Sequence, residues 1–404
     1  MTDTLKPRDA KEVEDAVRWA LGNEKTLEVA GSGSKRALGR PSQTDLTLDL
    51  SGLSGVTLYE PEELVLSANA GTPLSEIEAL LEKNSQELGF EPVDYGPVLG
   101  RAKGEGTIGG VIAANLAGPR RIKAGAARDH FLGVHAVTGR GDTIKSGGRV
   151  VKNVTGYDLC KVLAGSWGTL AAMTDITIKV LPRCETEATV IVAGLDDARA
   201  AQAMAAAMGS SCDVSAAAHL PDHVASSFDA LPKAEASTIL RLEGFAPSVA
   251  HRKDALAAAM KPFGAVTIVD AASSRALWRD VREVKPFASD GEAARPLWRI
   301  STAPMNGPAI AARITPAAQM FYDWAGGLIW IAMPFADEPD AGAIRRAVAE
   351  LGGHATLIRA PAAVRAAVDV FEPQESGVAA LSKRVKESFD PKSVLNPGRM
   401  WAGV

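Results

Sequence analysis

The stretch at residues 104–148 is unusually rich in glycine, and it constrains the fold more than any other feature of the sequence. Within it, residues 104–113 read Gly-Glu-Gly-Thr-Ile-Gly-Gly-Val-Ile-Ala, so two closely spaced pairs of glycines precede small apolar side chains. Because glycine has no Cβ atom, such backbone can pass close to a flat or crowded neighbour. Two interpretations remain open. One is a bound group with a flat or anionic surface, and the other is a close helix–sheet crossing beside a solvated basic edge.

A second glycine motif, Gly-Ser-Gly-Ser-Lys at residues 31–35, follows a segment that predicts a strand at 26–30. Small residues let backbone N–H groups approach an anion, and the serine and lysine side chains add donors, so the motif suggests a phosphate loop. It is not a dinucleotide-binding fingerprint, because Arg36 stands where the third glycine belongs, and the chain has no Walker A motif. A tight turn is the alternative.

Hydrophobic periodicity predicts an N-terminal half of mixed helices and strands that ends near Pro182. A helix is expected to begin after Asp9, which can cap its first turn, with Glu12 three residues further on. The other expected elements of this half are strands at 46–50, 65–70 and 173–181, a helix starting at Pro73, and a hairpin formed by 131–138 and 142–146.

The second half is rich in alanine, and its pattern changes. The expected elements are a strand at 186–193, a helix at 196–208, strands at 212–218 and 237–243, a helix at 248–260 and a strand at 265–269. This order is the split β-α-β pattern of ferredoxin-like domains. Further strands are expected at 297–302 and 327–333, and helices at 340–351 and 377–389. The fold class is therefore α+β.

Composition and charge argue against several classes of protein. The net charge is -4, so no general attraction to nucleic acid or anionic membranes is expected. The three cysteines are scattered and form no C-x-x-C pair, which argues against an iron–sulfur cluster or a zinc site in this chain. His219 and His223 have helical metal-ligand spacing, but Pro221 lies between them, so no metal site is expected. No apolar window is long enough for direct membrane insertion. We expect a cytoplasmic protein whose membrane association, if any, comes through a partner.

The glycine motifs, taken in order, resemble those of FAD-linked oxidases with a vanillyl-alcohol-oxidase-type (PCMH-type) FAD-binding domain. The resemblance is carried by G-S-G-S-K at 31–35, T-I-G-G at 107–110, K-N-V-T-G-Y-D-L at 152–159 and G-S-W-G-T-L at 165–170. Within this family, the chain looks like the smaller FAD-binding subunits of glycolate oxidases. That narrower match lies in A-G-P-R-R at 117–121, L-W-R-I-S at 297–301, G-G-H-A-T at 352–356 and N-P-G-R-M at 396–400.

The resemblance implies both an architecture and a set of contacts to FAD. It implies a PCMH-type domain of two α+β subdomains at 1–182, a ferredoxin-like cap at 183–375, and a C-terminal helix and tail at 376–404 that returns to the FAD domain. Gly31, Ser32, Gly33, Ser34 and Lys35 would hold the pyrophosphate, and Thr107, Ile108, Gly109, Gly110 and Ala113 would line the diphosphate and ribityl side. Asn153, Gly156 and Tyr157 would approach the flavin, and Ile176 would contact the adenine through its backbone. Asn396 and Arg399 would close the isoalloxazine pocket. Within the basic stretch from Lys103 to Lys123, Arg120 is the cation expected to point inward and contact the cofactor.

The flavin is expected to be held without a covalent bond. The first loop has neither histidine nor cysteine, and His130 and His135 lie outside the attachment motif usual in this superfamily. Relatives that oxidise 2-hydroxy acids have an H-G-D-G-N-x-H type motif, and this chain has only G-H-A-T at 353–356. His354 is therefore a candidate base or carboxylate ligand, or else a structural or interface histidine. Arg299 either clamps a substrate carboxylate or pairs with an acid across the sheet.

Three functions follow as hypotheses. In the first, the chain is the FAD-binding subunit of a complex that oxidises glycolate to glyoxylate. A larger FAD-containing subunit would carry the main substrate site, and an iron–sulfur subunit would pass electrons onward. In the second, the chain alone is an FAD-dependent 2-hydroxy acid dehydrogenase that uses Arg299 and His354. In the third, it is a non-catalytic scaffold with a vestigial FAD fold.

Overall fold

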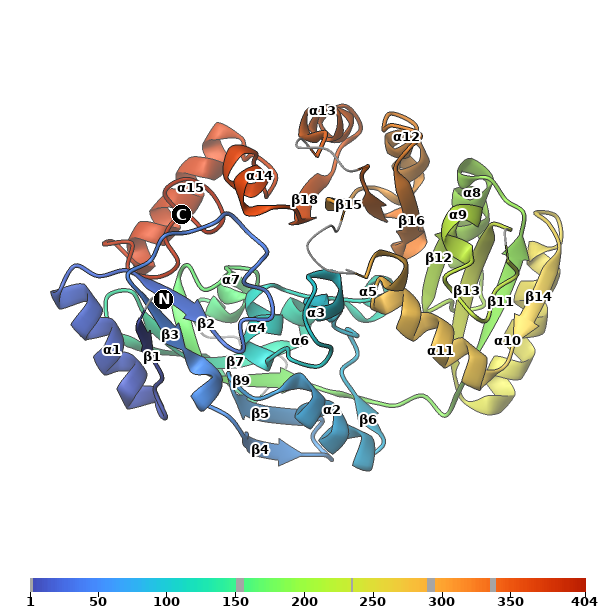
Figure 1. Ribbon diagram of the computed structural model, residues 1–404. Helices are drawn as coiled ribbons and strands as arrows, with labels where there is room; N and C mark the ends of the chain where they lie inside the picture. The colour runs from blue at the N-terminus through green and yellow to red at the C-terminus, as the bar shows by residue number, and fades with distance from the viewer. Residues whose placement is uncertain (1–2, 150–155, 234, 289–294, 335–338) are drawn as a thin grey trace. The chain divides into compact units, whose positions relative to one another are not determined.

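The computed structural model describes residues 3–149, 156–233, 235–288, 295–334 and 339–404 (Figure 1). The chain divides into two compact units. The first unit comprises Met1–Ala117, Gly125–Arg183 and Pro373–Val404, and the second comprises Gly118–Ala124 and Cys184–Glu372. None of the described helices has the length and apolar content needed to cross a membrane.

The first unit begins with a small parallel sheet and the helix that packs on it. The sheet has the order β1 (Asp3–Leu5), β3 (Leu46–Asp49) and β2 (Leu27–Ala30), and the helix is α1 (Ala10–Gly22). Asp9 accepts a hydrogen bond of 2.8 Å from the N–H of Glu12, as the capping pattern predicted. The buried face of α1 shares a core with β2, β3 and the C-terminal tail, where Leu395 forms a parallel bridge with Leu27.

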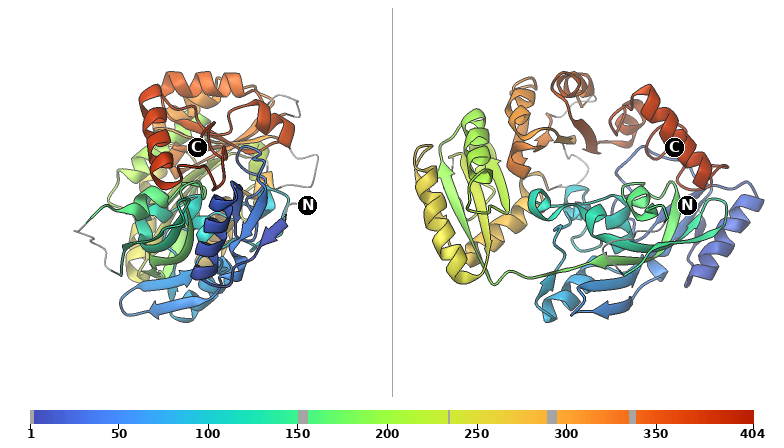
Figure 2. Two further views of the ribbon diagram at one scale, coloured as in Figure 1. Left: turned by 90° about the vertical axis from the view of Figure 1, so that its left-hand side faces the viewer. Right: turned by 180° about the vertical axis from the view of Figure 1, so that it is seen from behind.

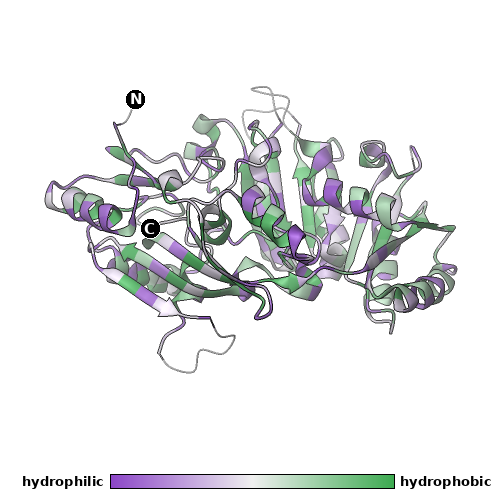
Figure 3. Ribbon diagram, turned by 90° about the horizontal axis from the view of Figure 1, so that it is seen from below, coloured by the Kyte–Doolittle hydropathy of each residue, from purple (hydrophilic) through white to green (hydrophobic). Residues whose placement is uncertain are grey.

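The larger sheet of the first unit is antiparallel. Its order is β4 (Val56–Glu60), β5 (Val65–Asn69), β9 (Ala171–Lys179), β7 (Phe131–Thr138) and β8 (Thr143–Gly147). The hairpin of β7 and β8 confirms the sequence prediction. Figure 3 shows the ribbon from below with each described residue coloured by its hydropathy. Pro73 is the N-cap of α2 and not its first residue, because its ψ of 135° is extended. The smaller elements here are α2 (Leu74–Lys83), β6 (Gln86–Glu87), α3 (Tyr95–Val98), α4 (Ile108–Ala113), α6 (Ala127–His130), α7 (Leu159–Leu163), β10 (Leu181–Pro182) and α15 (Ser376–Phe389).

The second unit is built on an eight-stranded sheet whose first half is ferredoxin-like, as predicted. Its elements are β11 (Thr186–Ala193), α8 (Asp197–Met208), β12 (Ala216–Leu220), β13 (Ser237–Gly244), α10 (Ala246–Met260) and β14 (Val266–Val269). The strand order is β14-β11-β13-β12, with antiparallel neighbours. Strand β12 lies later than the expected 212–218. Buried side chains of β11, β12 and β13 form one core with α8 and α10.

The second half of this sheet repeats the same topology, which the sequence did not reveal. Its elements are β15 (Leu297–Ser301), α12 (Gly307–Ala311), β16 (Gln319–Asp323), β17 (Leu328–Ala332), α13 (Ala341–Leu351) and β18 (His354–Arg359), in the strand order β16-β17-β15-β18. The two halves join where His219 of β12 pairs with Tyr322 of β16. We missed β16 and β18, since β16 is buried along most of its length and lacks polar alternation.

A long helix on the opposite face of the first half-sheet was also missed. In α11 (Ala271–Arg282), Trp278 donates a hydrogen bond of 2.9 Å from Nε1 to Thr189 Oγ1 of β11, whereas Val190 contributes to the core shared with α10. Figure 2 shows α10 and α11, coloured yellow to orange, from two further directions. The short helices of this unit are α5 (Arg121–Ala124), α9 (Asp222–Ala225) and α14 (Ala362–Ala367).

Candidate cofactor-binding site

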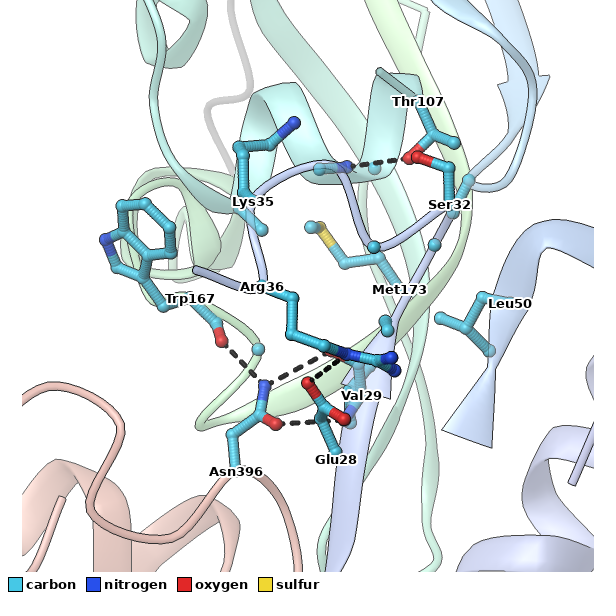
Figure 4. A pocket seen from close by; sticks show the side chains of 18 of the residues that line it. Glu28, Val29, Ser32, Lys35, Arg36, Leu50, Thr107, Trp167, Met173 and Asn396 are labelled. Carbon is cyan, nitrogen blue, oxygen red and sulfur yellow. Dashed lines mark hydrogen bonds and ion pairs between the residues drawn. The ribbon is translucent and has the colours of Figure 1, made fainter. Parts of the chain in front are cut away.

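The first unit contains a cavity whose wall is formed mainly by segments from four parts of the chain, with Leu50 and Ala70 as single additional residues (Figure 4). The end of β2 and the loop at 31–35 form one side, and the start of α4 forms another. The turn before β9 and the C-terminal tail complete the wall. The lining residues are Glu28, Val29, Ala30, Gly31, Ser32, Gly33, Ser34, Lys35, Arg36, Leu50, Ala70, Thr107, Gly109, Gly110, Ala113, Trp167, Gly168, Ala171, Met173, Asn396 and Arg399.

The loop at 31–35 has the properties of an anion cradle. A Cβ atom on Gly31 would lie 2.6 Å from Thr107 Oγ1, so only glycine lets this loop approach α4. Gly33 has a φ of 74°, a conformation that glycine adopts without strain. Within the described part of the chain, the backbone N–H groups of residues 32–35 donate no hydrogen bond to another residue. Since amides in a cavity wall need acceptors, these four groups fit an anionic ligand.

The glycines at the start of α4 have different neighbours. A Cβ atom on Gly109 would lie 2.7 Å from the carbonyl oxygen of Ala70, whereas one on Gly110 would lie 3.1 Å from Lys35 Cε. Gly109 therefore allows a close crossing of helix and strand, and Gly110 leaves room for the lysine. Thr107 caps the helix by accepting a hydrogen bond of 3.2 Å from the N–H of Gly110.

Lys35 is a basic residue of this wall whose pKa is changed by burial. Burial lowers its pKa to about 8, and the nearby charge of Asp94 partly offsets the effect. Its Nζ atom donates a hydrogen bond of 3.1 Å to Ser34 Oγ. By contrast, Arg36 forms an ion pair of 2.8 Å with Glu28. An anionic diphosphate beside Lys35 would raise the lysine pKa again and would accept hydrogen bonds from the free amides.

The C-terminal tail supplies two predicted residues to the same wall. Asn396 accepts a hydrogen bond of 2.9 Å from the N–H of Val29 and donates one of 2.8 Å to the carbonyl oxygen of Trp167. Figure 4 shows the Asn396 amide between these two segments. Arg399 donates a hydrogen bond of 2.9 Å to the carbonyl oxygen of Lys35. The tail thereby connects the loop at 31–35 with the turn before β9.

Several residues that were expected to contact FAD are not among the residues that line this cavity. Ile108 and Ile176 are fully buried and do not line the cavity. Gly156 does not line it either, Tyr157 is 90% exposed, and Asn153 lies outside the described residues. Arg120 belongs to the second unit, where it is buried and lies 3.4 Å from Glu243.

Other lining residues were missed. Trp167 stands in the G-S-W-G-T-L segment that the sequence had marked, so a signal for it was available. Its φ of 53°, which is unusual for a bulky residue, is known only from the structure. Met173 and Leu50 carry no signal that distinguishes them from core residues.

The two candidate catalytic residues lie on neighbouring strands of the second unit. Arg299 of β15 pairs in register with Thr356, and His354 of β18 pairs with Ser301, so both positions share one face of the sheet. The Arg299 guanidinium lies 4.8 Å from the centre of the Trp324 ring and makes no hydrogen bond or ion pair within the described residues.

His354 is exposed and lies near the positive charges of Arg299, Arg121 and Arg345. Desolvation and the charge of Arg299 lower its pKa, although Glu372 acts in the opposite direction. Gly353 has a φ of 128°, and a Cβ atom there would lie 2.4 Å from the carbonyl oxygen of Ser301. The glycine is therefore required to place His354 beside β15.

Comparisons with known proteins agree with this geometry. A family model described as an FAD binding domain matches residues 4–147. The chain is 34% identical over 389 residues to the glycolate oxidase subunit GlcE of Escherichia coli (strain K12), covering 96% of both chains. It is 24% identical over 426 residues to the glycolate oxidase subunit GlcD of Bacillus subtilis (strain 168), covering 98% of this chain and 88% of the relative.

A solved structure supports the fold assignment. The 4-ethylphenol oxidase from Gulosibacter chungangensis aligns with 99% of this chain and 89% of its own chain, with a TM-score of 0.72 and 13% identity. The expected PCMH-type α+β fold and the FAD cofactor are thereby confirmed. The chain belongs to the glycolate oxidase subunit family of FAD-linked oxidoreductases.

Proposed function

We propose that this chain binds FAD without a covalent bond in the cavity of the first unit and acts in the oxidation of glycolate to glyoxylate. The observation that carries the proposal is the row of unbonded amides at residues 32–35 beside Lys35, within a chain that belongs to a glycolate oxidase subunit family. We assign the FAD domain to residues 1–182, the cap to 183–375, and the returning helix and tail to 376–404.

The chain's own residues have separable roles in this proposal. The loop amides and Lys35 bind the diphosphate, and Asn396 and Arg399 orient the wall beside the ring system. When bound, FAD supplies a two-electron acceptor for alcohol oxidation. No histidine or cysteine appears among the lining residues, so the lining offers no residue of the types that attach flavin covalently in this superfamily.

We further propose that the chain works as one subunit of a complex, with a larger FAD-containing subunit and an iron–sulfur subunit as partners. The names of both relatives support a complex of several subunits, since each is called a subunit of glycolate oxidase. The main substrate site would lie on the larger subunit. We place the assembly in the cytoplasm, with any membrane contact made through the partners.

A second candidate function is a self-sufficient 2-hydroxy acid dehydrogenase. It is favoured by the Arg299 guanidinium, which has no hydrogen bond within the described residues and lies near His354. The Arg299 guanidinium would donate two hydrogen bonds to the substrate carboxylate, one to each oxygen. Unprotonated His354 would accept the proton of the substrate hydroxyl.

The visible absorbance spectrum of the purified chain, recorded anaerobically before and after adding glycolate, tests these alternatives. A flavin spectrum that stays oxidised supports a subunit that needs its partners, and bleaching by glycolate supports independent catalysis. A protein that remains colourless after refolding with excess FAD would contradict both and leave the scaffold hypothesis. Acid precipitation that leaves the flavin in solution tests the non-covalent attachment.

A further inference from the structure

The helix that leads into the C-terminal tail carries a buried lysine. Lys386 is 1% exposed and is the only buried residue of α15, all of whose residues are described. Lysine is almost never fully buried unless its charge is paired. Its partner is Asp390, also 1% exposed, and Lys386 Nζ lies 2.7 Å from Asp390 Oδ2.

The Lys386 ammonium uses all three of its hydrogen-bond donors. Besides Asp390, it donates to the carbonyl oxygen of Thr169 at 2.6 Å and to that of Leu395 at 2.9 Å. An ammonium group has three donors and no acceptor, so this geometry satisfies it completely. The lysine thus joins α15, the segment before β9 and the tail at one point.

Asp390 is bound as closely as its partner. Its Oδ1 accepts a hydrogen bond of 2.8 Å from the N–H of Val394, and its Oδ2 accepts one of 2.8 Å from the N–H of Leu395. A Cβ atom on Gly139 would lie 2.2 Å from the Asp390 carboxylate, so the turn of the β7–β8 hairpin closes against it. Arg140 of the same turn donates a hydrogen bond of 2.8 Å to the carbonyl oxygen of Ser388 near the end of α15.

The two carbonyl groups that Lys386 binds adjoin the cavity wall. Thr169 follows Trp167 and Gly168, and Leu395 precedes Asn396. Both neighbouring segments line the cavity, and the Asn396 amide connects them through the Trp167 carbonyl. Lys386 itself does not line the cavity. It can therefore affect a ligand only by fixing the backbone on which the lining residues stand.

We propose that Lys386 is a positioning residue for the flavin. Through its hydrogen bonds to the Thr169 and Leu395 carbonyls, it fixes the position of the Trp167–Gly168 turn relative to Asn396. The role depends on the proposed assignment of this cavity to FAD. A buried ion pair is not needed for stability as such, because well-packed apolar residues can replace such a pair without loss. Its value here is that one cation sets the relative position of two segments far apart in the sequence.

The test compares FAD affinity with folding stability in the full-length chain. Lys386→Met keeps the length of the side chain and removes the ammonium. We expect the Kd for FAD of the apoprotein, measured by quenching of flavin fluorescence, to rise about ten- to a hundredfold. The visible absorption band of the bound flavin should shift as well. Lys383→Met is the matched control, because Lys383 lies on the exposed face of the same helix with 67% of its side chain exposed. Its Kd for FAD and its flavin absorption band should equal those of the wild type.

A double variant separates positioning from stability. Lys386→Met/Asp390→Asn removes both buried charges, so the thermal midpoint of the apoprotein should recover toward the wild type. FAD affinity should remain low, since nothing then holds the Thr169 and Leu395 carbonyls together. This variant also carries the test if Lys386→Met alone does not fold. An FAD affinity that recovers in step with the thermal midpoint overturns the proposal, as does an unchanged affinity in Lys386→Met.

Gly31→Val distinguishes this failure from failure of the cavity assignment. If Gly31→Val binds FAD normally, the cavity is not the flavin site and the role of Lys386 falls with it. If Gly31→Val loses FAD while the Lys386 variants keep it, the cavity assignment stands and only the positioning role is wrong.

Discussion

Asn396 Nδ2 donates a hydrogen bond of 2.8 Å to the carbonyl oxygen of Trp167, which lies 229 residues away in the sequence. The same side chain accepts a hydrogen bond of 2.9 Å from the N–H of Val29. One amide group thus joins the tail to two parts of the cavity wall. The backbone φ of Asn396, 43°, lies in the left-handed region that asparagine tolerates better than most residues.

Asn396→Asp keeps the shape of the side chain and removes the donor. We expect the free energy of unfolding to fall by about 1–3 kcal/mol, because the Trp167 carbonyl loses its partner and faces a carboxylate. The Kd for FAD should rise about tenfold, which corresponds to about 1.4 kcal/mol. Chemical denaturation and flavin fluorescence measure the two effects. Asn84→Asp is the control, since exposed Asn84 donates to the carbonyl oxygen of Leu80 and neither residue lines the cavity.

Gly31→Ala should damage the FAD site. The new Cβ atom would lie 2.6 Å from Thr107 Oγ1, so the threonine must move and lose its capping bond to the N–H of Gly110. Loss of such a cap costs about 0.5–2 kcal/mol, and the displaced loop should retain less flavin per mole of protein. Gly22→Ala, where a Cβ atom meets nothing within 4 Å, should instead stabilise the protein by about 0.4–1 kcal/mol. Equal effects of the two substitutions would contradict the close approach.

FAD affinity should depend on pH through Lys35. Burial lowers the pKa of this lysine to about 8 in the ligand-free protein. The diphosphate favours the charged form, so binding raises the pKa, and protons are taken up on binding above pH 8. Affinity should therefore be constant below that pH and fall by up to about tenfold per pH unit above it. Lys35→Met should bind more weakly and lose this pH dependence. A wild-type titration that stays flat between pH 7 and pH 10 would count against Lys35 as a ligand of the diphosphate.

The second candidate function, in which this chain alone oxidises a 2-hydroxy acid, predicts that Arg299→Gln raises KM for glycolate without changing the flavin spectrum. Loss of a charge-assisted hydrogen bond to a carboxylate costs about 1.5–3 kcal/mol, or about ten- to a hundredfold. The assay uses the isolated, FAD-loaded chain and an artificial acceptor. Because desolvation and Arg299 lower the pKa of His354, the acid limb of kcat/KM should lie below pH 6.5. Arg313→Gln, which removes an exposed ion pair with Glu350 and a hydrogen bond to the Ala309 carbonyl oxygen, should leave KM for glycolate unchanged. An unchanged KM in Arg299→Gln would place the substrate carboxylate elsewhere.

Tyr322→Phe should destabilise the second unit. The Tyr322 hydroxyl donates a hydrogen bond of 2.5 Å to Asp197 Oδ2, at the junction of the two ferredoxin-like halves. Burial by itself raises the Asp197 pKa. The Tyr322 hydrogen bond and the His219 imidazole, whose Nε2 lies 3.3 Å from Asp197 Oδ1, outweigh that effect, so the pKa is lowered. This stabilisation is present above the ordinary aspartate pKa and is lost as pH falls through the lowered value.

Calorimetry at neutral pH should show that Tyr322→Phe lowers the free energy of unfolding by about 1–3 kcal/mol. This difference from the wild type should become smaller in acid. Tyr157→Phe is the control, because Tyr157 is 90% exposed. It should change neither the free energy of unfolding at neutral pH nor its dependence on pH.

The sequence by itself determined the local structure and the class of the cofactor. The Asp9 cap, the β7–β8 hairpin and the first β-α-β-β-α-β succession depend on neighbouring residues, so periodicity and turn chemistry were sufficient to predict them. The order of the glycine motifs identified the FAD-linked oxidase family without any contact being known.

Only the tertiary structure decided which residues share the cavity wall. Gly109 and Gly110 are adjacent in the sequence, yet one faces Ala70 and the other faces Lys35. The repeat of the ferredoxin-like topology, the place of Met173 in the wall and the burial of Lys386 likewise had no local signal. The physical reason is that these features are contacts between distant segments. Their side-chain directions follow from how strands and helices pack, and no pattern within one segment specifies them.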